Sequence, residues 1–248
     1  MQTAANPFII LKSVDSTNNY AMGMIHDGVA KHGQAWFSYE QTHGKGRRGK
    51  VWKAGEGKNV ILSIALAPSF LTVYQQFQLN VAASLAAFNL LSKYAGDECK
   101  IKWPNDIFWN DRKAGGILIE NVLQGQTWQW AVVGIGININ QTEFDIYSTF
   151  KPVSLKQITG KEHDIVELAK ELHADVLKRF DQLKNGDFEK MLIEYNQSLF
   201  KQNDKVRLKK DNAVFETTIK EISRQGKLIT VDTMEREFEF DDVEWVGE

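Results

Sequence analysis

The sequence predicts an α+β fold, with a mixed domain over roughly the first 195 residues and a small β-barrel after it. Helical and strand patterns alternate through the first region. After about Leu199 the composition changes, and only short alternating strands follow. The chain has 248 residues and 43% apolar content, which suffices for one substantial core plus a small appended domain. We place the division between residues 198 and 199, giving domains 1–198 and 199–248.

The elements of the first domain are expected in the following order, from hydrophobic periodicity and flanking turn residues. They are a strand over 8–14, a helix opening at Asp15-Ser16-Thr17, strands over 34–41 and 59–67, a helix over 77–94, strands over 116–123 and 128–139 joined by a turn at 124–126, and a helix over 165–183 capped by Asp164 and stopped by Asn185-Gly186. In the second domain, strands are expected over 205–208, 214–222, 228–232 and 237–240.

Composition excludes several classes of protein. The formal net charge of −2 disfavours a general nucleic-acid binder. A single cysteine, Cys99, excludes a disulfide framework and a cysteine-based zinc site. Neither a signal peptide nor an apolar run of the ~18 residues that a membrane span requires is present. We therefore expect a soluble, cytoplasmic protein without a membrane partner.

The strongest functional signal is the glycine-rich basic loop Gly44–Lys50 (GKGRRGK). From His43 to Lys58, six Lys and Arg residues stand against one acidic residue. Clustered cations repel one another until an anion collects them, so this loop is expected to order around a phosphate-bearing ligand. A solvated basic turn is the plain alternative. A P-loop is excluded, because Val51 stands where that motif needs a Mg²⁺-binding Ser or Thr.

Two further motifs carry polar groups next to restricted backbone. In 102–106 (KWPND), the proline fixes the chain so that Asn105 and Asp106 can face a ligand or Mg²⁺. In 113–120 (KAGGILIE), Lys113 precedes two glycines, which suits binding of a small acid's carboxylate. Taken singly, each motif is better explained without a ligand, the first by a core tryptophan beside an Asx turn and the second by a solvent-exposed lysine before a glycine turn.

The strand ending at Asn140 has one face of Val132, Gly134, Gly136, Asn138 and Asn140. A glycine-lined face implies that another group packs against bare backbone there, either a core element or a flat ligand. The pattern GxGxxG is not satisfied, which disfavours a dinucleotide fold.

The segment Asp15-Ser16-Thr17-Asn18 is typical of a helix N-cap, and it could also hydrogen-bond a neutral polar head group. Gln41 could supplement it with a donor and an acceptor.

Together these motifs, in this order, resemble the biotin–protein ligase family over most of the chain. The resemblance implies a catalytic domain related to class II aminoacyl-tRNA synthetases, followed by an SH3-like barrel. It implies biotin contacts from Ser16, Thr17, Asn18, Gln41, Lys45, Gly46, Arg47, Lys113 and Gly115, and ATP contacts from Arg48, Trp52, Asn105, Asp106 and Asn138. Lys113 and Arg47 would be the catalytic residues, and Asp106 is the candidate Mg²⁺ ligand.

The implied reaction uses ATP and Mg²⁺ to form biotinyl-5′-AMP and pyrophosphate from biotin. Biotin then passes to a lysine of the biotin carboxyl carrier domain of a carboxylase. Such chemistry depends on positioning and charge stabilisation, so no enzyme nucleophile is needed. A lipoate or octanoate ligase of the same fold is the enzymatic alternative, and a biotin-sensing regulator is the non-enzymatic one. Homodimer formation stays open.

Three features depart from the family pattern. Lys45 and Lys50 stand where the family commonly has Arg, which keeps the charge and loses bidentate phosphate geometry. The last expected strand region, 241–245, lacks the family's pattern, so no site residue is assigned to the second domain. The catalytic pattern begins by Ser13, which leaves no room for an N-terminal DNA-binding domain, and we expect no specific DNA affinity.

Overall fold

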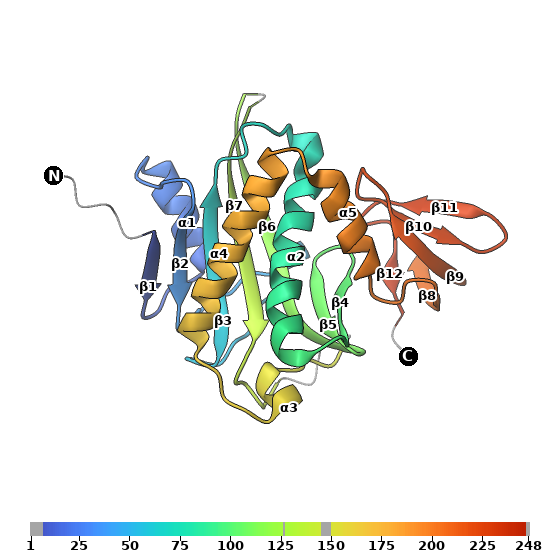
Figure 1. Cartoon of the computed structure of the whole chain (residues 1–248), viewed down its shortest axis with the longest axis horizontal. Coiled ribbons are helices and arrows are strands. Elements are labelled where there is room, and N and C mark those ends of the chain that lie inside the picture. The colour runs from blue at the N-terminus through green and yellow to red at the C-terminus, as the bar shows by residue number, and fades with distance from the viewer. Residues whose placement is uncertain (1–6, 126, 145–149, 247–248) are drawn as a thin grey trace.

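The computed structural model of the chain describes residues 7–125, 127–144 and 150–246. Its larger sheet has the strand order β1-β2-β3-β7-β6-β5-β4 (Figure 1). The β1–β2 pair is parallel, and the other neighbouring pairs in this sheet are antiparallel. The strands are β1 (Phe8–Leu11), β2 (Gln34–Ser38), β3 (Asn59–Leu66), β4 (Cys99–Lys102), β5 (Asp106–Trp109), β6 (Arg112–Gln124) and β7 (Thr127–Asn138).

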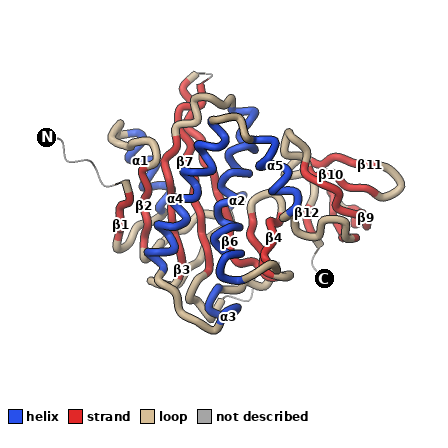
Figure 2. The backbone as a smooth tube through the Cα atoms, viewed as in Figure 1, coloured by secondary structure: helices blue, strands red, loops and turns tan. Residues whose placement is uncertain are grey.

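Helices cover both faces of this sheet. The helices are α1 (Thr17–His26), α2 (Gln76–Ala95), α3 (Leu155–Thr159), α4 (Ile165–Lys184) and α5 (Phe188–Gln197), with short 3₁₀ turns at Arg47–Gly49 and Val73–Gln75. Figures 1 and 2 show α2 and α4 lying side by side across one face. On the opposite face, α1 packs its Ala21 and Ile25 against Trp36 and Val132. Because both faces are covered, β3 is buried along its whole length.

Capping explains where the predicted helices begin. Ser16 is the N-cap of α1, and its hydroxyl accepts from the Asn19 N–H. Asp164 caps α4 by accepting from the N–H groups of Val166 and Glu167. Both satisfy donors that the first turn of a helix leaves unpaired. The helix predicted over 165–183 is confirmed to within one residue.

The C-terminal unit is a five-stranded antiparallel sheet in the order β11-β10-β9-β8-β12. Its strands are β8 (Lys205–Lys210), β9 (Ala213–Ile222), β10 (Leu228–Val231), β11 (Glu235–Phe238) and β12 (Glu244–Trp245). It packs beside α5 and α2 (Figure 1), where Gly226 lies against the Phe77 ring and its carbonyl accepts from Trp103 Nε1 at 2.9 Å. One continuous apolar core runs through both units. The division after residue 198 stays a prediction.

Several elements differ from expectation. The β4–β5 hairpin, α3, α5 and β12 were not predicted. Strands β4, β5 and β12 and helix α3 are too short for a clear hydrophobic period. Strand β6 begins at Arg112 rather than 116, so Lys113 lies within a strand and not before a turn. In the predicted turn at 124–126, residue 126 lies outside the described residues.

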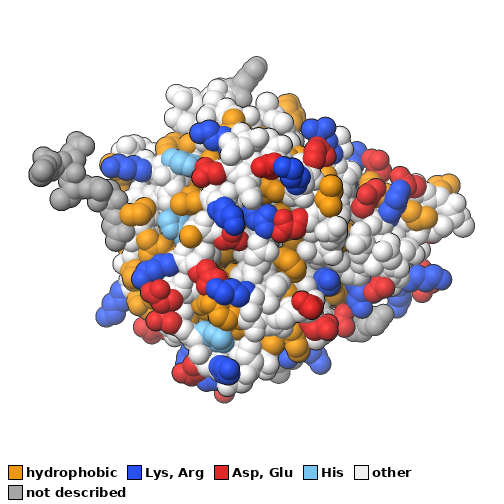
Figure 3. All heavy atoms as spheres, viewed as in Figure 1, with side chains coloured by type: hydrophobic (Ala, Val, Ile, Leu, Met, Phe, Trp, Pro, Cys, Tyr) orange, Lys and Arg blue, Asp and Glu red, His pale blue; other side chains and the backbone are white. Residues whose placement is uncertain are grey.

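Two further observations concern the charges on the surface and the hydropathy of the helices. Acidic and basic side chains are interspersed over the face that α2 and α4 cover, as Figure 3 shows. None of the helices within the described residues combines the length and hydropathy needed to cross a bilayer.

Candidate functional site

A cavity of about 1110 Å³ opens on the sheet face opposite α2 and α4. It is bounded by the start of α1, strands β3, β6 and β7, the β4–β5 hairpin, the basic loop and the C-terminal unit. The structure brings nearly all the predicted site residues to this cavity: Ser16, Thr17, Asn18, Gln41, Lys45, Gly46, Arg47, Arg48, Trp52, Asn105, Asp106, Lys113 and Asn138. Gly115 is the exception, and its neighbour Gly116 lines the cavity instead.

Strand register explains the glycines on the cavity face. Gly134 and Gly136 of β7 pair with Leu118 and Gly116 of β6. A Cβ at Gly134 would collide with the Asn18 side-chain amide, and one at Gly136 would lie 2.5 Å from the Trp52 indole. Two side chains therefore rest on bare backbone, as the glycine-lined face predicted.

Gly115 allows strands β6 and β7 to lie at their normal spacing. A Cβ there would lie 2.9 Å from the carbonyl oxygen of Gly136, so β6 and β7 could not keep their spacing. This steric requirement alone accounts for the first glycine of the 113–120 motif.

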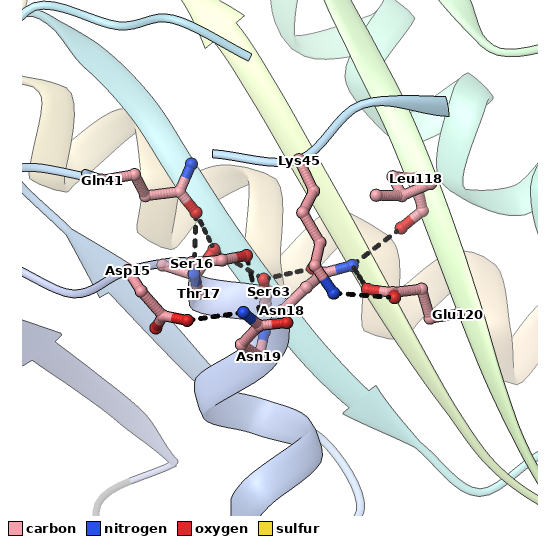
Figure 4. Close-up of polar contacts among 10 residues, drawn as sticks. All are labelled: Asp15, Ser16, Thr17, Asn18, Asn19, Gln41, Lys45, Ser63, Leu118 and Glu120. Carbon is pink, nitrogen blue, oxygen red and sulfur yellow. Dashed lines mark hydrogen bonds and ion pairs between the residues drawn. The ribbon is translucent and has the colours of Figure 1, made fainter. Parts of the chain in front are cut away.

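Polar side chains from α1, β3 and the start of the basic loop converge at one end of the cavity (Figure 4). Gln41 Oε1 accepts from the Thr17 N–H at 2.7 Å and from Thr17 Oγ1 at 3.0 Å. Ser63 Oγ lies 2.7 Å from Thr17 Oγ1 and donates to Asn18 Oδ1 at 2.6 Å. The Thr17 donors converge on one carbonyl oxygen, so this end can bind a neutral carbonyl group if Gln41 moves aside.

Beside this cluster, Glu120 joins the basic loop to α1. Its Oε2 accepts from Asn18 Nδ2 at 2.7 Å, and Lys45 Nζ lies 3.3 Å from its Oε1 (Figure 4). Asn18 is 4% exposed, and its amide is engaged at both ends, by Ser63 and by Glu120. The amide therefore holds the site's shape and positions Glu120.

Further along the cavity, the KWPND and KAGG motifs meet across strands. Lys113 Nζ lies 2.6 Å from Asp106 Oδ1, and a Cβ on Gly116 would lie within 3.4 Å of both groups. Asn105 Nδ2 donates to the Ile117 carbonyl at 2.6 Å, and its Oδ1 accepts from Arg47 at 3.4 Å. This arrangement fixes a lysine ammonium in the middle of the cavity, with one carboxylate beside it.

Asn138 anchors the backbone around Lys113. Its Nδ2 donates to the carbonyls of Lys113 and Val153, at 3.3 and 3.2 Å. The side chain is 4% exposed. It therefore positions the start of β6.

The basic loop reaches the C-terminal unit. Arg48 adopts a left-handed conformation (φ 55°) and donates from Nε to Asp241 Oδ1 at 2.9 Å. Arg47 lies 3.6 Å from Asp241 Oδ1, with its guanidinium 5.3 Å from the Phe240 ring centre. Burial lowers the pKa of Arg47, and Asp241 partly offsets this. A half-buried guanidinium favours the approach of a further anion.

The C-terminal unit, to which the sequence assigned no site residue, contributes to the wall of the cavity. Phe240, Val243, Glu244 and Trp245 of that unit all line it. Lys102 and Phe150 were also missed as lining residues. The clearest available signal was Lys102 itself, a lysine beside a core tryptophan.

Charge indicates the class of ligand. Among the described lining residues, seven Lys and Arg side chains stand against three carboxylates. Cations at this density in a concave site concentrate anions. The cavity thus has a neutral polar end at Thr17 and Gln41, and the rest of its wall is strongly cationic.

Comparison with known proteins gives the family. Residues 10–138 match the biotin/lipoate A/B protein ligase family. The chain is 32% identical over 158 residues to the bifunctional ligase/repressor BirA of Bacillus spizizenii, covering 63% of this chain and 48% of that protein. It is 36% identical over 133 residues to the biotin–[acetyl-CoA-carboxylase] ligase of Paracoccus denitrificans, covering 52% and 53% respectively. The chain thus matches about half the length of these curated relatives.

A solved structure extends the likeness to the whole fold. The biotin protein ligase of Aquifex aeolicus, in complex with biotin and ATP, superposes with a TM-score of 0.80 at 25% identity. The match covers 96% of this chain and 97% of that one. With over half of its length matching the family and nearly all of it sharing the fold, this chain belongs to the biotin/lipoate A/B protein ligase family.

Proposed function

We propose that this chain is an ATP-dependent biotin protein ligase. It condenses biotin with ATP to biotinyl-5′-AMP and pyrophosphate, and then transfers biotin to a lysine of a carboxylase carrier domain. One observation carries the proposal: a single cavity joins the converging Thr17 donors to the cationic region around Lys113 and Arg47. Biotin has the same polarity, with a neutral ureido carbonyl at one end and a carboxylate at the other.

Lys113 is the residue best placed to act at the reacting atoms. In the ligand-free arrangement its ammonium rests on Asp106, 2.6 Å away. An incoming carboxylate can take the place of that partner, so Lys113 would hold the nucleophilic oxygen against the α-phosphorus of ATP. Holding both reactants in line supplies much of the rate in phosphoryl and nucleotidyl transfer.

Arg47 and Trp52 would hold the adenylate. Arg47 stands at the cavity wall between Asn105 and the C-terminal unit, where a phosphate could replace its long contact to Asn105. Trp52 packs closely against Gly136 and lines the cavity. The loop over the cavity would also shield the reactive anhydride from water.

The donor set suits Mg²⁺ bound mainly through phosphates. Within the described residues, no cluster of three potential His, Cys, Asp or Glu ligands exists. Mg²⁺ commonly needs only one or two carboxylates when a nucleotide supplies the rest, and Asp106 is the carboxylate beside Lys113. Bound Mg²⁺ would neutralise phosphate charge there.

The transfer step needs no further group from the chain. The acceptor's lysine amine attacks the carbonyl carbon of the mixed anhydride, an amide bond forms, and AMP leaves with the electron pair. The acceptor is expected to be the carrier domain of a biotin-dependent carboxylase, by analogy with the Paracoccus relative.

Biotin-dependent ATP–pyrophosphate exchange tests the proposal. Purified protein should exchange labelled pyrophosphate into ATP only when biotin is present, and should label an acetyl-CoA carboxylase carrier domain on one lysine. Exchange driven by lipoate or octanoate, with biotin inert, would assign the chain to the lipoate branch of the family. The absence of exchange with every acid would reject the ligase function.

A further inference from the structure

Glu120, on β6, connects two segments that enclose the neutral polar end of the cavity. Among the described residues it does not itself line the cavity, but it contacts two that do, Asn18 and Lys45. Its Oε2 accepts from Asn18 Nδ2 at 2.7 Å, and its Oε1 lies 3.3 Å from Lys45 Nζ (Figure 4). One carboxylate therefore ties the start of α1 and the basic loop to the same strand.

Both groups that face Glu120 are hydrogen-bond donors. The amide nitrogen of Asn18 and the ammonium of Lys45 have only hydrogens to offer, and each approaches a different oxygen of the carboxylate. A carboxylate accepts at both oxygens, whereas a glutamine amide accepts at one end and donates at the other. Only a carboxylate at position 120 can therefore make both contacts at once.

The contact to Asn18 fixes which way its amide points. With Nδ2 on Glu120, Oδ1 faces Ser63 and accepts its hydroxyl proton at 2.6 Å. Ser63 Oγ in turn lies 2.7 Å from Thr17 Oγ1, so Asn18 belongs to the same hydrogen-bonded chain as the Thr17 donors. Asn18 and Ser63 are 4% and 0% exposed, and a lost partner cannot be replaced by bulk water there. A disturbance at Glu120 should thus reach the Thr17 donors.

The contact to Lys45 holds the beginning of the basic loop. Lys45 closely follows Gln41, whose Oε1 occupies the Thr17 donors in the ligand-free arrangement. A ligand carbonyl can reach those donors only if Gln41 moves, and the ion pair keeps the adjoining chain on β6 meanwhile. The Lys45 and Glu120 side chains are 41% and 28% exposed, so this pair alone should contribute little, and the contact to Asn18 should dominate.

We propose that Glu120 is a positioning residue for biotin, acting through the Asn18 amide and the Lys45 ammonium without touching the ligand. This deepens the proposed ligase function and rests on it. Glu120 holds these two groups where the ureido ring is received, and it takes no part in making or breaking bonds. Its loss should weaken biotin binding equally before and during the reaction, which raises KM for biotin and spares kcat.

Glu120→Gln tests the need for a second accepting oxygen, because it keeps the shape of the side chain. Its new amide nitrogen must face either the Lys45 ammonium or the Asn18 amide nitrogen, so two donors oppose each other in both orientations. The KM for biotin in ATP–pyrophosphate exchange, and the Kd by calorimetry, should rise about tenfold. The kcat at saturating biotin, and transfer from saturating synthetic biotinyl-5′-AMP, should stay close to the parent's, which also shows that the variant folds.

The double variant Asn18→Asp with Glu120→Gln exchanges the carboxylate and the amide between the two positions. The carboxylate at position 18 then accepts from the amide nitrogen at position 120 and from Ser63, while the amide oxygen at 120 accepts from Lys45. Asn18→Asp alone places two carboxylates against each other and should raise KM for biotin at least as much as Glu120→Gln. The double variant should bind biotin more tightly than either single variant, within about threefold of the parent.

Glu171→Gln is the matched control. Glu171, on α4, likewise accepts from a lysine and a neutral donor, Lys93 Nζ at 2.6 Å and the Tyr94 hydroxyl at 2.9 Å, and is not among the described residues of the cavity wall. It should keep the parent's KM for biotin.

Three results would overturn the positioning role of Glu120. They are an unchanged KM for biotin in Glu120→Gln, a fall in its kcat as large as the rise in KM, and a double variant with a KM not below those of both single variants. Failure of the parent itself to exchange pyrophosphate with biotin would count against the ligase function instead.

Discussion

Replacing Gly136 with alanine should separate ATP use from biotin binding. The added Cβ would lie 2.5 Å from Trp52 Cε2, 2.7 Å from Cζ2 and 2.9 Å from Nε1. Ordinary contact is 3.4–4 Å, so the indole must move by about 1 Å. A shift of that size at a substrate-positioning group costs roughly a hundredfold in rate, which corresponds to about 2.7 kcal/mol.

The assay is biotin-dependent ATP–pyrophosphate exchange over a range of ATP concentrations, with biotin affinity measured separately by calorimetry. We expect loss in kcat/KM for ATP and an unchanged biotin affinity, because the biotin end of the cavity is built by Thr17, Gln41 and Ser63. Overpacking should also lower the free energy of unfolding by about 1–3 kcal/mol.

Gly23→Ala is the control for the glycine substitution itself. No atom lies within 4 Å of a Cβ at Gly23, which is in α1. This variant should keep the parent's rate and gain about 0.5–1 kcal/mol of stability from helix propensity. If Gly136→Ala also retains the parent's kcat/KM for ATP, the contact between Trp52 and the β7 backbone does not position the nucleotide.

Four further predictions concern single side chains. Lys113→Ala should slow exchange roughly a hundredfold with little change in the unfolding midpoint, and an unchanged rate would make Lys113 a structural lysine. Arg47→Gly should release the adenylate roughly thirtyfold faster, so that an unrelated protein incubated with biotin and ATP becomes biotinylated. If mass spectrometry finds no more biotinylated lysines on that protein than with the parent enzyme, the prediction is contradicted. Thr17→Val should weaken biotin binding about tenfold by calorimetry, whereas equal affinity would remove Thr17 from the biotin site. Burial lowers the pKa of Lys102 to about 7, which means that the unfolded chain binds more protons between pH about 7 and 10.5, so the free energy of unfolding should rise with pH across that window. Lys102→Met should therefore stabilise the protein most below pH 7, by on the order of 5 kcal/mol. Denaturant titrations showing a gain independent of pH would refute the lowered pKa of Lys102.

The sequence alone was enough to predict the long elements, because their hydrophobic periods and caps are local. The helix beginning after Asp164 and the strands around Leu62 and Ile135 appear where hydrophobic spacing placed them. It also determined that something rests on the backbone at Gly134 and Gly136, since a missing side chain on a buried strand implies a close neighbour. Motif order was enough to suggest the family.

Which groups share the cavity depends on how the strands and helices pack together. Asn18 and Glu120 are 102 residues apart and meet through one hydrogen bond. Gly115 lies so close to the Gly136 carbonyl of the neighbouring strand that a Cβ would collide with it, a contact that the sequence alone does not show. Lys102 acquires its character from Phe150 and Trp245, which are distant in sequence and carry no motif. Burial and cross-strand proximity depend on long-range packing, and a single sequence records neither.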